Sequence, residues 1–191
     1  MQYTNPHLIL STFFGLGKFA GRIAGTIGSL VAFPITLYCF KLSHFLQQFF
    51  HFDNIIIGAI TIPIICVIIL FVMGSISSSI YSKALSKNDP KEVIIDEIVG
   101  QMLCLILTIP ISLLFFQMYF VDYPLDLGLI IMLLTNFVLF RFFDIVKPWP
   151  ICWVEKKFKG GFGIMFDDII ASIFASVVYF AIFFTMIDYF K

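Results

Sequence analysis

The chain has 191 residues, 60% of them hydrophobic and only 13% charged, which is about half the charged share of an average soluble domain. Its formal net charge is zero at pH 7, and it has no basic face or tail of the kind that binds nucleic acid. A mean hydropathy of +1.02 excludes a soluble globular protein and indicates an integral membrane protein. The length predicts one helical membrane domain over residues 1–191.

The N-terminal stretch HLILSTFFGLG is too short to span a bilayer and is expected to form an interfacial or re-entrant piece. Longer apolar segments follow, each reaching the roughly 20 residues that a bilayer-crossing helix needs. They are 29–50, 54–74, 98–120, 127–146 and 169–189. The predicted fold is therefore all-α, a multi-pass membrane protein with about five long helices and a short N-terminal interfacial helix.

Five crossings decide on which side of the membrane each connection lies. Ten basic residues fall on the side where the first long segment begins: Lys18, Arg22, Lys83, Lys87, Lys91, Arg141, Lys147, Lys156, Lys157 and Lys159. Lys41 and Lys191 are assigned to the other side. The positive-inside rule then predicts that the lysine-rich side faces the cytoplasm.

Four polar motifs lie at segment ends on this same side: GRIAGTIGSL (21–30), IIDEIVGQ (94–101), FRFFDIVKPWPI (140–151) and GGFGIMFDDIIAS (160–172). They bring together five carboxylates, those of Asp96, Glu97, Asp144, Asp167 and Asp168. So many like charges at a membrane surface repel one another unless something neutralises them. Oxygen-rich clusters of this kind suit hard cations, above all Mg²⁺ where phosphate is present.

Two basic residues accompany the carboxylates. Arg141 has a planar guanidinium group and Lys147 has a compact ammonium group, and these two groups are best suited to bind a phosphate. In a helix they share one stripe with Asp144, and Pro148 is expected to end that helix. The GTIGS and GGFG stretches each precede an expected helix start, where free backbone N–H groups favour anions.

Simpler interpretations exist for these residues. Asp96 and Asp168 could cap the N-termini of their helices, and Arg141 with Asp144 could be a structural ion pair. Trp149 and Trp153 are expected to be interfacial anchors. None of these interpretations accounts for the gathering of all the acidic pairs on one side.

If the site handles a phosphate, the residues of three other phosphatase chemistries are missing. A cysteine phosphatase needs an arginine shortly after its cysteine, and no arginine closely follows a cysteine here. A haloperoxidase-like lipid phosphatase needs histidines and a haloacid-dehalogenase-type enzyme needs a DxD motif, but no histidine lies near the acidic pairs and no DxD is present. The four cysteines are far apart, so a disulfide framework or a zinc site is not expected. A metal-activated water is the mechanism that remains.

The DEIVGQ, FRFFDIVKPWPI and GGFGIMFDDIIAS motifs, after a GTIGSL opening, resemble the phosphatidylglycerophosphatase A family over about residues 14–189. The resemblance implies an Mg²⁺-dependent enzyme of the bacterial inner membrane that hydrolyses phosphatidylglycerophosphate to phosphatidylglycerol and phosphate. Two positions depart from the family pattern: Ala24 stands where a proline is usual, and Ser172 where a glycine is usual. Neither departure removes a charged group.

The resemblance implies that the five acidic and two basic residues form the active site. We expect Mg²⁺ to bind Asp96, Asp167 and Asp168, and Arg141 and Lys147 to bind the phosphate. Glu97 or Asp144 is expected to orient the attacking water.

The alternatives are a phosphatase for another lipid phosphate and a small membrane transporter or ion-binding protein. The transporter alternative requires ionisable groups at mid-membrane, where the segments, apart from Lys41, hold only small polar residues such as Thr61, Thr108 and Asn136.

Overall fold

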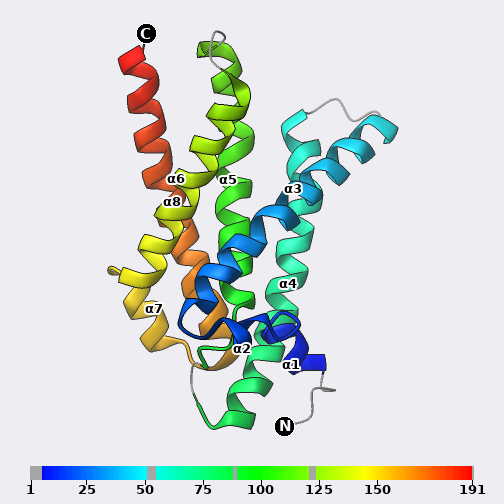
Figure 1. Ribbon diagram of the computed structural model, residues 1–191, viewed down its shortest axis with the longest axis vertical. Coiled ribbons are helices and arrows are strands. Elements are labelled where there is room, and N and C mark those ends of the chain that lie inside the picture. Colours follow the sequence, from blue (N-terminus) through cyan, green and yellow to red (C-terminus); the bar gives the residue numbers. More distant parts are fainter. Residues whose placement is uncertain (1–5, 51–54, 88–89, 121–123, 191) are drawn as a thin grey trace.

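The computed structural model describes residues 6–50, 55–87, 90–120 and 124–190, and over these ranges the chain forms helices without any strand (Figure 1). The elements are α1 (Pro6–Ser11), α2 (Leu16–Ala20), the 3-10 helix η1 (Gly21–Ile23), α3 (Ala24–Phe50), α4 (Ile55–Leu85), α5 (Ile95–Tyr119), α6 (Leu125–Val146), α7 (Ile151–Lys157) and α8 (Gly160–Phe190). Five of them are long and apolar enough to cross a membrane, so the predicted fold class is confirmed. Lys191, which we assigned to the side opposite the site, lies outside the described residues.

The long helices extend beyond the apolar segments that predicted them. α3 begins at Ala24 rather than residue 29, α4 continues to Leu85, and α8 begins at Gly160 rather than residue 169. Hydropathy marks the part of a helix that matches the bilayer, whereas packing and backbone hydrogen bonds continue the helix past that boundary. The capping alternative is therefore wrong: Asp96 lies in the first turn of α5 after the cap residue Ile94, and Asp168 lies about two turns inside α8.

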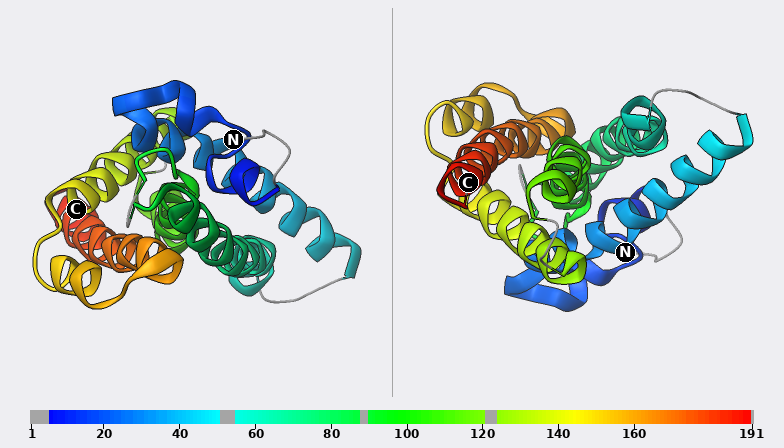
Figure 2. Two further views of the ribbon diagram at one scale, coloured as in Figure 1. Left: turned by 90° about the horizontal axis from the view of Figure 1, so that it is seen from below. Right: turned by 90° about the horizontal axis from the view of Figure 1, so that it is seen from above.

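Helix α5 forms the centre of the bundle, and α3, α4, α6 and α8 surround it (Figure 2). In an apolar 18-residue window of α5, 61% of the residues are buried, against 17% in the corresponding window of α4. Its buried side chains include Ile98, Val99 and Met102, which are fully shielded from solvent. Residues at the beginning of α5 are thus held by neighbours on several sides.

Polar contacts inside the bundle connect pairs of helices. Pro63 lies inside α4, and the nearby backbone N–H of Ile62 donates to the hydroxyl of Ser43 in α3 at 3.1 Å. The amide of Asn136 in α6 donates to the hydroxyl of Thr108 in α5 at 2.6 Å. Hydrogen bonds between membrane helices satisfy polar groups that lipid cannot hydrate. Asn136 and Thr108 therefore have a structural role at mid-bundle.

The N-terminal helices pack against the same end of the bundle from which α5 and α8 start (Figure 1). α1 lies against α4, and the backbone N–H of Ile94 donates to the carbonyl of Ser11 at 3.0 Å. Phe14 and Phe19 are exposed, at 76% and 86% of their surface. Exposed aromatic side chains on a short helix and on the turn before it, beside membrane spans, agree with the interfacial location expected for this stretch.

We expect Gly161→Ala to destabilise the contact between α4 and α8 by about 1–3 kcal/mol, the usual range for overpacking a close contact. A Cβ at Gly161 would collide with the carbonyl oxygen of Ser75, and the Gly161 N–H donates to the Ser79 hydroxyl at 2.8 Å. Gly58→Ala is the matched control, because the atoms nearest to its Cβ would belong to the flexible side chain of Gln47. Thermal unfolding in detergent measures the melting temperatures of the two variants, and equal melting temperatures would contradict the expectation.

Candidate active site

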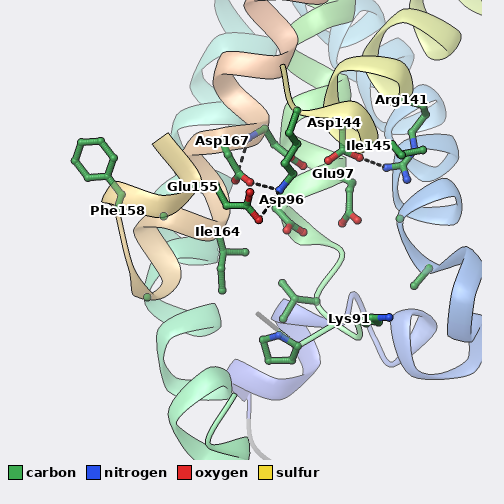
Figure 3. Close-up of a pocket in the computed structure, with 18 of the residues that line it drawn as sticks. Lys91, Asp96, Glu97, Arg141, Asp144, Ile145, Glu155, Phe158, Ile164 and Asp167 are labelled. Atoms are coloured by element: carbon green, nitrogen blue, oxygen red, sulfur yellow. Dashed lines mark hydrogen bonds and ion pairs between the residues drawn. The ribbon is translucent and has the colours of Figure 1, made fainter. Parts of the chain in front are cut away.

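A cavity of about 680 Å³ opens at the end of the bundle where α3, α5 and α8 begin and α6 ends (Figure 3). Each of the residues that we predicted as site residues lines it: Asp96, Glu97, Arg141, Asp144, Lys147, Asp167 and Asp168. They come from α5, α6, the residue after α6, and α8. Motifs that are 20 or more residues apart in sequence thus face one space, as the count of membrane crossings suggested.

Three of the carboxylates form a compact group. Asp96 and Glu97 from α5 and Asp168 from α8 each place an oxygen within 4.8 Å of the other two. The two helices approach closely here because position 100 of α5 has no side chain: a Cβ at Gly100 would lie 3.1 Å from the Cβ of Asp168. Asp167, which we expected in the metal site, is not part of this group, and Glu97 is.

The group has free ligand atoms of the kind that a hard cation needs. Oxygen Oε2 of Glu97 and oxygen Oδ2 of Asp168 are buried, and neither accepts a hydrogen bond from any residue that the structure describes. A buried carboxylate oxygen without a donor is costly unless a cation or water binds it. Carboxylate oxygens are also the ligands that Mg²⁺ prefers in proteins. The residues present therefore fit the metal that the family resemblance implies.

Arg141 and Asp144 form an ion pair on the wall opposite α8. The guanidinium Nη1 donates to Asp144 Oδ2 at 2.5 Å, so the structural ion pair that we considered exists. The pair leaves Arg141 Nε buried with no acceptor among the described residues, so a donor remains available for a ligand. Gly25 of α3 makes room for these groups, because a Cβ there would collide with Glu97 Oε1 and lie 2.9 Å from the Arg141 nitrogens.

Lys147 departs from the predicted helical stripe. α6 ends at Val146, and Lys147 follows in the left-handed conformation (φ 44°, ψ 57°), which non-glycine residues rarely adopt. Its ammonium group therefore turns toward α8 and α7, where it lies 2.5 Å from Asp167 Oδ2 and 3.4 Å from Glu155 Oε1. The stripe prediction is correct for Arg141 and Asp144 and wrong for Lys147.

Electrostatics keep the lysine charged. Burial by itself would lower the pKa of Lys147, but the nearby carboxylate of Asp167 outweighs it and holds that pKa above its ordinary value. The ammonium group is thus a permanent cation beside the acidic group. Its partner Asp167 is 4% exposed, so its charge is compensated by Lys147.

The glycine-rich stretches have packing roles as well. GTIGS lies inside α3 rather than before it, and Gly28 approaches the carbonyl oxygen of Ile94 so closely that a Cβ would lie 3.0 Å away. Gly160 adopts a positive φ of 75° and begins α8. Gly25, Gly160 and Gly163 do line the cavity, but as bare backbone between neighbouring side chains.

The two departures from the family pattern leave the site intact. Ala24 is helical (φ −54°, ψ −50°) and 3% exposed, so α3 starts here without a proline. The Ser172 hydroxyl lies 2.6 Å from the carbonyl of Gly100 and 2.6 Å from that of Asp168. It connects α8 to α5 one turn beyond the acidic group.

Four charged residues lining the cavity were not predicted as site residues: Arg22, Lys91, Glu155 and Lys159. From the sequence, Lys91 and Lys159 indicate only the topology, and no local pattern marks Glu155 as a site residue. Glu155 approaches Lys147 only because the short helix α7, which connects α6 to α8, packs against α8. Only the tertiary structure identifies such a contact.

A family model described as Phosphatidylglycerophosphatase A matches residues 9–183. The chain is 28% identical to the Escherichia coli protein of that name over 94% of this chain and 86% of that one. It is 56% identical to the Haemophilus influenzae protein of the same name over 50 residues, which are 26% of this chain and 31% of that protein. A Bacteroides thetaiotaomicron protein, provisionally named phosphatidylinositol-3-phosphatase, is 28% identical over 90% and 89% of the two chains. No solved structure matches the chain significantly.

Proposed function

Since the chain belongs to the phosphatidylglycerophosphatase A family, we propose that it hydrolyses phosphatidylglycerophosphate to phosphatidylglycerol and phosphate with Mg²⁺ at the cytoplasmic membrane face. It is a membrane enzyme, a phosphatase of a lipid phosphate. The observation that supports the site best is the single cavity lined by acidic and basic residues from α5, α6 and α8. We place the enzyme in the bacterial inner membrane, with the lysine-rich helix ends facing the cytoplasm.

The acidic group is the proposed metal site. Asp96, Glu97 and Asp168 would hold Mg²⁺, because their oxygens lie together and those of Glu97 and Asp168 include buried atoms without a donor among the described residues. This set replaces Asp167 of our sequence-based expectation with Glu97. Bound Mg²⁺ supplies neutralisation of the negative charge that develops during hydrolysis of a phosphate ester.

The basic residues position the phosphate. The ion pair with Asp144 fixes the Arg141 guanidinium, and its free Nε can donate to a phosphate oxygen. The contacts with Asp167 and Glu155 fix the Lys147 ammonium on the other side of the cavity. With Glu97 in the metal group, Asp144 is left to accept a proton from the attacking water through its second oxygen.

The depth of the site suits a lipid substrate. The cavity lies at the ends of the membrane helices rather than at mid-bundle, so it is reached from the headgroup level of the bilayer. A transporter would instead need ionisable groups at mid-membrane. The Asn136 amide at mid-bundle donates to Thr108 of the neighbouring helix, which favours packing over transport.

The decisive experiment measures phosphate release by the detergent-purified protein from phosphatidylglycerophosphate, with Mg²⁺ and with EDTA. We expect release with Mg²⁺ and a fall to background with EDTA, since the carboxylates would then lack their cation. Release that is unaffected by EDTA would overturn the metal assignment. No release from this lipid in folded protein with Mg²⁺ would overturn the proposed function.

A second candidate is a phosphatase for another lipid phosphate, which the name of the Bacteroides relative favours. Phosphatidic acid and phosphatidylinositol 3-phosphate serve as competing substrates in the same assay. If either is hydrolysed faster than phosphatidylglycerophosphate, this second candidate is correct.

A further inference from the structure

Three exposed basic residues line the cavity outside the acidic group: Arg22, Lys91 and Lys159. Among the residues that the structure describes, none of the three forms an ion pair with a carboxylate, whereas Arg141 and Lys147 both do. A cation that faces a cavity without a counter-ion is available to an anionic ligand. The hydrolytic roles proposed above use none of these three residues.

Arg22 and Lys91 belong to the N-terminal side of the cavity. Arg22 lies in η1, directly before α3, whose residues Ala24 and Gly25 also line the cavity. Lys91 lies in the loop before α5. Figure 3 shows Lys91 on the same side as Arg141, where the N-terminal helices run, with Glu155 and Phe158 across the cavity. Lys159 follows α7 and belongs to the opposite wall.

Exposed apolar side chains make the N-terminal side accessible to lipid. Phe19 and Ile23 flank Arg22 with 86% and 59% of their surface exposed, and Ile145 of the cavity wall is 69% exposed. Apolar side chains exposed beside membrane spans are expected to contact acyl chains and the lipid interface. A basic residue between them keeps its charged group at headgroup level.

The substrate of the proposed function carries two phosphates. The terminal monoester is the one that is hydrolysed, and the diester connects the headgroup to the acylated glycerol. When the monoester lies at the acidic group, the diester remains closer to the bilayer, at the rim of the cavity. Building on the proposed function, we infer that Arg22 and Lys91 bind this phosphodiester and so select a headgroup with two phosphates.

Two simple compounds test the two parts of the site separately. Phosphatidylglycerol, the lipid product, retains only the diester and is a probe for Arg22 and Lys91. Inorganic phosphate resembles only the monoester and is a probe for the acidic group with its Mg²⁺. Both are measured as competitive inhibitors of phosphatidylglycerophosphate hydrolysis in mixed micelles of constant composition.

In the R22Q/K91Q variant we expect KM and the inhibition constant of phosphatidylglycerol to rise together by about tenfold or more, the effect of losing contacts between charged groups. We expect kcat and the inhibition constant of inorganic phosphate to stay within about twofold, because those contacts do not involve the reacting phosphate. Both residues are exposed, and unchanged thermal unfolding verifies the fold.

The matched control is K83Q/K156Q, which removes two exposed charges from the same end of the molecule but outside the cavity. If KM and the inhibition constant of phosphatidylglycerol rise equally in the control, only the surface charge matters, and the inference is overturned. Unchanged inhibition by phosphatidylglycerol in R22Q/K91Q would also overturn the inference. So would weaker inhibition by phosphatidylglycerol in Lys159→Gln instead of in R22Q/K91Q. Failure of the proposed function itself is seen earlier, as absent hydrolysis by the unmodified protein.

Discussion

Asp168→Asn is expected to lower kcat by about 10³-fold or more, because removing an essential charge from an active site costs several kcal/mol of transition-state stabilisation. Asp168 is 3% exposed, lies with Asp96 and Glu97, and has a buried oxygen without a donor among the described residues. Asparagine keeps the shape of the side chain while removing its charge. Steady-state phosphate release from phosphatidylglycerophosphate at saturating Mg²⁺ measures the loss.

The same substitution is expected to leave the protein folded. Neutralising one of several clustered carboxylates removes repulsion between like charges, so the melting temperature without Mg²⁺ should be unchanged or higher. Asp188→Asn is the matched control, since Asp188 lies exposed near the far end of the same helix α8. Normal turnover in Asp168→Asn would remove Asp168 from the metal site.

Glu97→Gln is expected to raise the Mg²⁺ concentration for half-maximal activity by about 10- to 100-fold or more, the range seen even for residues that only support metal ligands. Asp167→Asn is expected to leave that concentration nearly unchanged while lowering kcat. The difference arises because Glu97 lies with Asp96 and Asp168, whereas Asp167 lies 2.5 Å from the Lys147 ammonium. Titration of phosphate release with Mg²⁺ separates the two effects.

The outcome distinguishes two ligand sets. If Asp167→Asn raises the Mg²⁺ requirement and Glu97→Gln does not, the metal binds Asp167 as the motifs alone led us to expect. Asp126→Asn is the control, because Asp126 is exposed in the first turn of α6 at the opposite end of that helix from Asp144. It should match the unmodified protein in both kcat and Mg²⁺ requirement.

Hydropathy and local motifs were sufficient to predict the helical membrane fold and the composition of the site. An apolar segment of bilayer length indicates a helix that lies in lipid, so five spans could be counted without knowledge of tertiary contacts. Counting the crossings also placed all the predicted acidic and basic site residues on one side, and each of these site residues lines the cavity. The order of crossings is a topological property, which needs no knowledge of distances.

Distances between side chains could not be predicted in this way, because they depend on how the helices pack. Helix rotation and the close approach at Gly100 bring Glu97, rather than Asp167, into the group of carboxylates with Asp96 and Asp168. A left-handed residue after α6 turns Lys147 away from the stripe that periodicity predicted. Glu155 and Arg22 reach the cavity because short helices fold back beside the spans. Such contacts depend on packing between segments distant in sequence, and neither hydropathy nor local motifs carry that information.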